Sequence, residues 1–196
     1  MNQLSREEIK KLVLELPDKF QHPTTTSHEF KNQLIDKFYG SNCDVLEVGC
    51  HKGQTSKILS YLFNNVFAMN INPPSGEFPT ENNIIYEQMD SYLDNWKLDK
   101  WKNVDVVMID AVHEYNEVLR DTENSLKLKP KYIVYDDYGS LMFPGVKEFV
   151  DDFVKENDLK LEPIGLEKGK FIKENVQLSD SEGVIIELWT QFIWLQ

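Results

Sequence analysis

The chain has 196 residues, 41% of them hydrophobic and 28% charged, which suits one globular domain with a single sizeable core. Its formal net charge of -12 repels a phosphate backbone, so we expect no nucleic-acid partner. Its two cysteines are too few for a disulfide framework. No apolar run approaches the roughly 20 residues that cross a bilayer, so we expect a soluble, cytoplasmic protein without a membrane partner.

The first 40 residues favour two amphipathic helices. Apolar residues recur at helical spacing over residues 4–16, and Pro17 is expected to end that helix. The Thr/Ser-rich stretch 24–27 is expected to cap a second helix, which ends at Gly40. We therefore divide a single domain, 1–196, into an N-terminal helical cap (1–40) and a core (41–196).

From residue 41 onward, short apolar runs alternate with helical patterns. The predicted strands are 44–48, 66–69, 83–86, 104–109, 132–135, 159–164 and 184–189. The predicted helices between them are 54–63, 114–127 and 146–155. This alternation predicts a doubly wound, mostly parallel α/β sheet with helices on both faces. The apolar stretch 192–195 is expected to dock on the sheet or to join two chains as a homodimer.

A glycine-containing turn is expected where the first strand ends. Its spacing is Glu47-x-Gly49-x-x-x-Gly53, and glycines allow a tight turn and a close approach of the backbone to a ligand. Ligands of open parallel sheets bind beyond the carboxyl ends of the strands. The pattern differs from the Gly-x-Gly-x-x-Gly of dinucleotide enzymes, and an ordinary strand-to-helix turn is the alternative interpretation.

Acidic residues follow the fourth and fifth predicted strands. Asp110 ends the first of these, and Asp136 and Asp137 end the second. Neighbouring strands lie about 4.8 Å apart, so these carboxylates would repel one another, and a bound cation would relieve the repulsion. Oxygen ligands suit Mg²⁺, which we expect, and also Ca²⁺ or Mn²⁺. Alternatively, each aspartate caps a helix or a turn.

Two further residues near these strand ends are candidates for the chemistry. His113 could remove a proton from a hydroxyl, or it could be a histidine at a helix start that bonds to the backbone. Asp90 follows the third strand and could accept a hydrogen bond from an exocyclic amine such as that of adenine. A helix cap is an equally good interpretation of Asp90.

Three segments resemble motifs of class I S-adenosylmethionine-dependent methyltransferases. Residues 47–56 resemble the first motif, and residues 107–121, with Asp110-x-x-His113-x-Tyr115, resemble the fourth. Residues 135–153 look like the macrocin O-methyltransferase family, which methylates sugar hydroxyls on macrolides. The likeness covers about residues 44–153. It implies a Rossmann-like sheet of seven strands with an antiparallel last strand.

The resemblance also implies how S-adenosylmethionine would bind. Glu47, Gly49 and Gly53 would line its methionine and ribose end, and Asp90 and Ser91 would face its adenine.

The second strand of this superfamily usually ends in an acidic residue that binds the ribose hydroxyls. Here that residue is Asn70, which forgoes a charge-assisted hydrogen bond worth about 1–2 kcal/mol.

For catalysis, the resemblance implies a metal-assisted reaction. Asp110, Asp136 and Asp137 match the ligands of a divalent metal in O-methyltransferases of the catechol type. His113 stands where those enzymes have a catalytic Lys or His, and Asp110 would serve the catalytic and cofactor sites as well. The expected function is methyl transfer to a hydroxyl of a small molecule of sugar or natural-product type. The alternatives are a metal-independent methyltransferase and a non-catalytic binding protein of the same fold.

Overall fold

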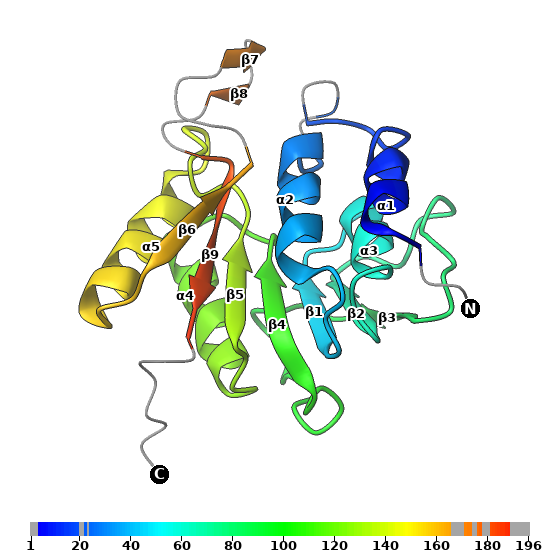
Figure 1. Cartoon of the computed structure of the whole chain (residues 1–196). Coiled ribbons are helices and arrows are strands. Elements are labelled where there is room, and N and C mark those ends of the chain that lie inside the picture. Colours follow the sequence, from blue (N-terminus) through cyan, green and yellow to red (C-terminus); the bar gives the residue numbers. More distant parts are fainter. Residues whose placement is uncertain are drawn as a thin grey trace.

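The structure is a computed structural model that describes residues 4–19, 22, 24–165, 171–173, 176–177 and 181–188. Its centre is a seven-stranded sheet with the order β3-β2-β1-β4-β5-β9-β6 (Figure 1). The strands are β1 (Asp44–Val48), β2 (Val66–Asn70), β3 (Ile84–Gln88), β4 (Val104–Ile109), β5 (Tyr132–Tyr135), β6 (Leu161–Ile164) and β9 (Gly183–Glu187). Strand β9 pairs antiparallel with both β5 and β6, whereas β3, β2, β1, β4 and β5 pair in parallel. The predicted sheet, with its antiparallel last strand, is confirmed.

Helices cover both faces of the sheet. They are α1 (Arg6–Val13), α2 (His28–Phe38), α3 (Gln54–Leu59), α4 (Tyr115–Leu126) and α5 (Pro144–Glu156). The apolar faces of α1, α2 and α3 pack in one cluster on one side of the sheet, and those of α4 and α5 pack in a second cluster on the other (Figure 1). A two-stranded hairpin, β7 (Phe171–Lys173) and β8 (Val176–Gln177), stands apart from the sheet.

The helix ends differ slightly from the sequence expectation. As predicted, the loop before α2 caps it, because the Ser27 Oγ accepts a hydrogen bond from the Phe30 N–H at 3.0 Å. Helix α1 ends at Val13 rather than at residue 16, because residues 14–16 form tight turns with i to i−3 hydrogen bonds before Pro17. Helix α3 ends at Leu59 rather than at residue 63 for the same reason.

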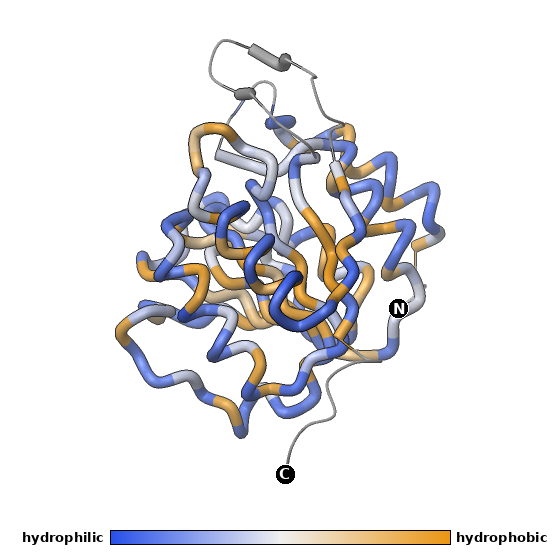
Figure 2. The backbone as a smooth tube through the Cα atoms, turned by 90° about the vertical axis from the view of Figure 1, so that its left-hand side faces the viewer, coloured by the Kyte–Doolittle hydropathy of each residue, from blue (hydrophilic) through white to orange (hydrophobic). Residues whose placement is uncertain are grey.

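Burial explains why β4 is apolar along nearly its whole length, although β1 also buries two acidic residues, Asp44 and Glu47. Every residue of β1 is buried, as are five of the six residues of β4. A strand that is covered by helices on both faces has no polar side. Figure 2 shows many hydrophobic residues gathered in the middle of the molecule, with hydrophilic stretches along the outer helices.

The strand order reverses between β1 and β4, because β2 and β3 follow β1 on one side and β4 and β5 lie on the other. The register of the sheet aligns the ends of β1, β4 and β5. Val48 lies opposite Ile109, and Ile109 lies opposite Tyr135. The residues that follow, Gly49, Asp110 and Asp136, therefore lie side by side at the same edge. In a doubly wound sheet, this switch point is where ligands bind.

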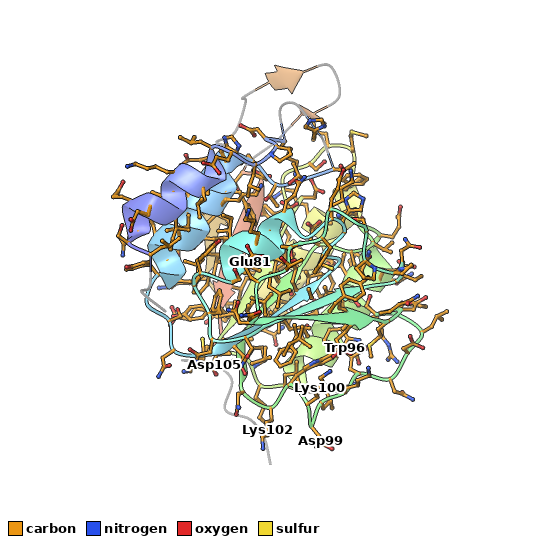
Figure 3. The ribbon with its side chains drawn as sticks, turned by 90° about the vertical axis from the view of Figure 1, so that its right-hand side faces the viewer. Glu81, Trp96, Asp99, Lys100, Lys102 and Asp105 are labelled. Atoms are coloured by element: carbon orange, nitrogen blue, oxygen red, sulfur yellow. The ribbon has the colours of Figure 1, made fainter. Side chains whose placement is uncertain are left out.

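Charged residues of the segment before β4 pair with Glu87 of β3. Figure 3 shows Asp99, Lys100 and Lys102 in this segment. Lys100 forms an ion pair with Glu87, as does Lys97 at 2.8 Å. No helix in the described part of the chain is long and apolar enough to cross a membrane. The apolar stretch 192–195, expected to dock or to dimerise, lies outside the described residues.

Candidate active site

A cavity of about 580 Å³ opens at the carboxyl ends of the parallel strands. Its walls come from the segments that follow β1, β2, β3, β4 and β5, together with the loop before α2. Its lining includes Thr24, Thr25, Gly49, Asn70, Asp90, Ser91, Asp110, His113, Asp136, Asp137 and Phe143. Most of the residues predicted to form the site are therefore brought to one place.

The turn after β1 requires glycine at its first position. Gly49 has a φ of 96°, and a Cβ built there would lie 1.9 Å from the backbone oxygen of Asp110. The ends of β1 and β4 are thus packed backbone to backbone at the cavity wall.

Two other residues of the predicted turn do not line the cavity. Glu47 is buried beneath it and accepts a hydrogen bond from the Ser56 Oγ, and burial raises the pKa of Glu47 to about 8. Gly53 borders a separate depression, where a Cβ would lie 2.4 Å from Pro79. Their predicted contact with the cofactor stays a prediction.

Asn70 and Asp90 lie in the cavity wall formed after β2 and β3. The Asp90 Oδ1 accepts hydrogen bonds from the backbone N–H groups of Tyr92, at 3.0 Å, and Leu93, at 3.1 Å. Residues 91–94 form turns rather than a helix, so Asp90 closes a turn of the backbone and faces the cavity as well. Ser91 lines the cavity beside it.

Asp110, His113 and Asp137 form the cluster at the other end of the cavity. The His113 Nε2 lies 3.5 Å from the Asp110 Oδ1 and 3.3 Å from the Asp137 Oδ2. One potential metal-ligand atom from each residue falls within 4.8 Å of the others. The His113 ring stacks on Phe143 with 4.3 Å between the ring centroids, which fixes the plane of the imidazole.

The Asp136 side chain lies toward Lys19 rather than toward His113. Its Oδ2 lies 3.6 Å from the Lys19 Nζ, and its buried Oδ1 has no hydrogen-bond partner among the described residues. Asp137, with a φ of 55°, turns back toward His113. The structure therefore groups Asp110 and Asp137 with His113, whereas the sequence analysis grouped them with Asp136.

Lys19 is the residue of this site that sequence reasoning missed. Its side chain is 3% exposed, and its Nζ lies 2.9 Å from the Asp137 Oδ1 and 3.2 Å from the Glu182 Oε1. Glu182 is fully buried and precedes β9. No local sequence motif marks either residue. They come together only because the first 20 residues pack against the segment before β9.

The burial of these charges shifts their pKa values. Burial and the neighbouring carboxylates raise the pKa of Asp110, and they raise that of Asp136 well above its ordinary value. Burial alone would lower the pKa of Lys19, but the charges of Asp136, Glu182 and Asp137 more than offset this, so the pKa lies well above its usual value. For His113, burial is likewise outweighed by Asp110 and Asp137, and its pKa is raised.

No family model and no curated protein matches the chain by sequence. Solved structures match it in fold. Precorrin 8w decarboxylase of Methanobacterium thermoautotrophicum has a TM-score of 0.58 and 16% identity, over 87% of this chain and 97% of that one. The apo structure of CalS11, a TDP-rhamnose 3'-O-methyltransferase of calicheamicin biosynthesis, has a TM-score of 0.56 and 10% identity, over 94% and 93%.

A third similar structure holds ligands. It is the MycE methyltransferase of the mycinamycin pathway in complex with Mg, SAH and mycinamycin VI, with a TM-score of 0.57 and 12% identity. The match covers 95% of this chain but 55% of MycE, so the chain spans about half of that protein. At these identities the likeness concerns the fold: this chain has the Rossmann-like fold found in these methyltransferases.

Proposed function

We propose that this chain is an S-adenosylmethionine-dependent methyltransferase that transfers a methyl group to a hydroxyl of a small molecule of sugar or natural-product type. One observation carries the proposal. A single cavity at the switch point joins a wall of hydrogen-bonding residues, Asn70 and Asp90, to a cluster that can remove a proton, Asp110, His113 and Asp137. A site of this kind can place a cofactor and an acceptor side by side.

The size and charge of the cavity support this cofactor. A volume of about 580 Å³ lies in the range of pockets that enclose small ligands. Asp90, Asp110 and Asp137 give the cavity a negative wall, which favours the positive sulfonium centre of S-adenosylmethionine. CalS11 and MycE, which share the fold, are methyltransferases by name, and MycE was crystallised with SAH.

The residues present also fit a divalent cation such as Mg²⁺. Asp110 and Asp137 would hold it. Asp136 also lines the cavity, and its Oδ1, which has no hydrogen-bond partner among the described residues, would be a third oxygen ligand if its side chain turned toward the other two. When bound, such an ion polarises the acceptor oxygen and lowers the pKa of its hydroxyl.

The protein residues would then carry out the proton transfer. The His113 ring is held by stacking on Phe143, and its Nε2 lies 3.3 to 3.5 Å from two carboxylates, so a neutral His113 could take the proton from the acceptor hydroxyl. Asp110 stabilises the imidazolium that results. Gly49 lets the ends of β1 and β4 pack backbone to backbone at the cavity wall, which would hold Asp110 in place for this chemistry.

A metal-independent methyltransferase is the second candidate, and one observation favours it. The Lys19 ammonium already neutralises part of the charge of Asp136 and Asp137. In that case the acid–base chemistry of His113 would proceed without a metal ion, and EDTA would leave turnover unchanged.

Calorimetric titration of the protein with S-adenosylmethionine and with S-adenosylhomocysteine, each with and without Mg²⁺, tests the proposal. We expect micromolar binding of both despite Asn70. If neither compound binds, the chain keeps the fold for another purpose. If both bind, hydroxylated acceptors should be screened with Mg²⁺ and with EDTA, which separates the two candidates.

A further inference from the structure

A buried lysine, Lys19, neutralises part of the negative charge of the carboxylates at the strand ends. Asp136, Asp137 and Glu182 are each buried, and such groups repel one another strongly where water is excluded. The Lys19 Nζ approaches all three, at distances of 2.9 to 3.6 Å. It comes from the loop after α1 and contacts the Oδ1 of Asp137, whereas His113 lies against the Oδ2 of the same residue.

One ammonium group neutralises only part of the negative charge of these carboxylates, which leaves room for a second cation. The Lys19 ammonium contacts one oxygen of Asp136 and one of Asp137. The Asp136 Oδ1 is buried and has no hydrogen-bond partner in the part of the chain that the structure describes, and the Asp137 Oδ2 and the Asp110 Oδ1 lie 3.3 and 3.5 Å from the His113 Nε2. Buried carboxylate oxygens normally find a donor or a cation.

We propose that the Lys19 ammonium acts as a built-in cation of this cluster and sets how tightly the cluster binds a divalent metal ion. The inference rests on the proposed function, because the metal would occupy the same site. Lys19 shares Asp136 and Asp137 with the metal, so its positive charge repels the incoming ion and lowers the negative charge that attracts it. Lys19 is thus a positioning residue, which holds the carboxylates together when no metal is bound.

Another buried lysine near the cluster shows that burial alone does not create this role. The Lys31 side chain is fully buried, yet its Nζ donates a hydrogen bond to the backbone oxygen of Thr26 rather than to a carboxylate. Among the described residues, Lys19 is the lysine that forms ion pairs with Asp136 and Asp137.

Direct titration with Mn²⁺, followed by electron paramagnetic resonance of the free ion, tests the inference without any turnover. We expect Lys19→Met to bind Mn²⁺ at least about tenfold more tightly than the wild type. Lys19→Arg, which keeps the charge, should stay within about threefold of the wild type. The matched control is Lys52→Met, which removes the same charge from an exposed pair with Glu77, outside the cluster, and should change the affinity less than about twofold.

Lys19→Met could fail to fold because it leaves buried carboxylates without a partner. The double variant Lys19→Met/Glu182→Gln removes one charge of each sign, and it should also bind Mn²⁺ more tightly than the wild type. An unchanged or weaker affinity in the folded variant, or no Mn²⁺ binding in either protein, overturns the inference. Calorimetry with S-adenosylmethionine on the same samples reports separately on the proposed function.

Discussion

His113 lies against two carboxylates and one aromatic ring, an arrangement that orients an imidazole for proton transfer. We expect His113→Ala to lower the turnover number by about 10²–10⁴, because the general base is lost. The affinity for S-adenosylmethionine should change little. Steady-state kinetics and calorimetry measure the two effects. His22→Ala is the control, because His22 is exposed and does not line the cavity; a loss below about threefold in His113→Ala would remove His113 from this role.

Glu47 gives a pH dependence to the stability of the protein. Burial raises its pKa in the folded state from 4.5 to about 8. Between pH 4.5 and about pH 8, Glu47 therefore carries a proton in the folded state but not in the unfolded state. It follows that the contribution of Glu47 to stability is complete below pH 4.5 and is lost as the pH rises to about 8.

Glu47→Gln should remove this dependence. Inside the window, one pH unit changes the free energy of unfolding by about 1.4 kcal/mol for each proton concerned. We therefore expect the variant to gain on the wild type by at least about 2 kcal/mol between pH 5.5 and pH 8, as measured by urea unfolding without ligand. Glu7→Gln, on an exposed side chain, should follow the wild type. Parallel profiles for Glu47→Gln and the wild type would contradict the assignment.

At the residue scale, the sequence predicts the site residues that directly follow a strand. It does not predict those that reach the site through contacts between distant parts of the chain. Asp110 and His113 were predicted because both follow the end of a strongly apolar strand. Whether Asp136 or Asp137 faces His113 depends on the left-handed backbone of Asp137, which no local pattern indicated. Lys19 reaches the site through a tertiary contact of 118 residues' separation with Asp137, so it carries no local signal.

At the scale of elements, some of the turns that connect strands and helices require a glycine. Gly49 joins β1 to the turn before α3, and any Cβ there would overlap the backbone of Asp110. Gly40, after α2, also has a positive φ, of 81°, but has no atom near its Cβ position. Gly76, in the loop after β2, has neither constraint.

These three sites predict a graded series of alanine variants. Gly76→Ala should change the free energy of unfolding by less than about 0.5 kcal/mol. Gly40→Ala should cost about 1 kcal/mol through backbone strain alone. Gly49→Ala should cost about 3 kcal/mol or more and should abolish binding of S-adenosylmethionine, because the ends of β1 and β4 must separate. Chemical unfolding and calorimetry test the order, and equal stability of Gly49→Ala and Gly40→Ala would refute it.

The elements that the sequence predicted best are those with one strong pattern. The apolar run of β4, and the stripe of α5 that follows Pro144, are local signals that burial on the sheet reinforces. The insertion of β9 between β5 and β6 is a property of the whole sheet. The short hairpin of β7 and β8 escaped prediction because a pair of two- and three-residue strands has too few residues for a periodic pattern.

At the scale of the whole molecule, the net charge of -12 acts on everything that approaches the cavity. Part of that charge lies at the cavity itself, in Asp90, Asp110 and Asp137, whereas other charges, such as those of Glu87 and Lys100, pair with each other. The molecule should therefore favour neutral or cationic ligands over anionic ones.

The two forms of the proposed cofactor provide a matched test of this electrostatic preference. S-adenosylmethionine carries one more positive charge than S-adenosylhomocysteine, at the sulfonium, and the two molecules otherwise differ by one methyl group. We expect S-adenosylmethionine to bind about three- to tenfold more weakly when KCl is raised from about 20 mM to about 500 mM, because salt screens the attraction. S-adenosylhomocysteine should change by less than about twofold, since its net charge is zero. Calorimetry at the two salt concentrations gives both values. If the two ligands respond equally to salt, the charge of the cavity does not act on the sulfonium, and the cofactor then lies elsewhere or with its methyl end away from the carboxylates.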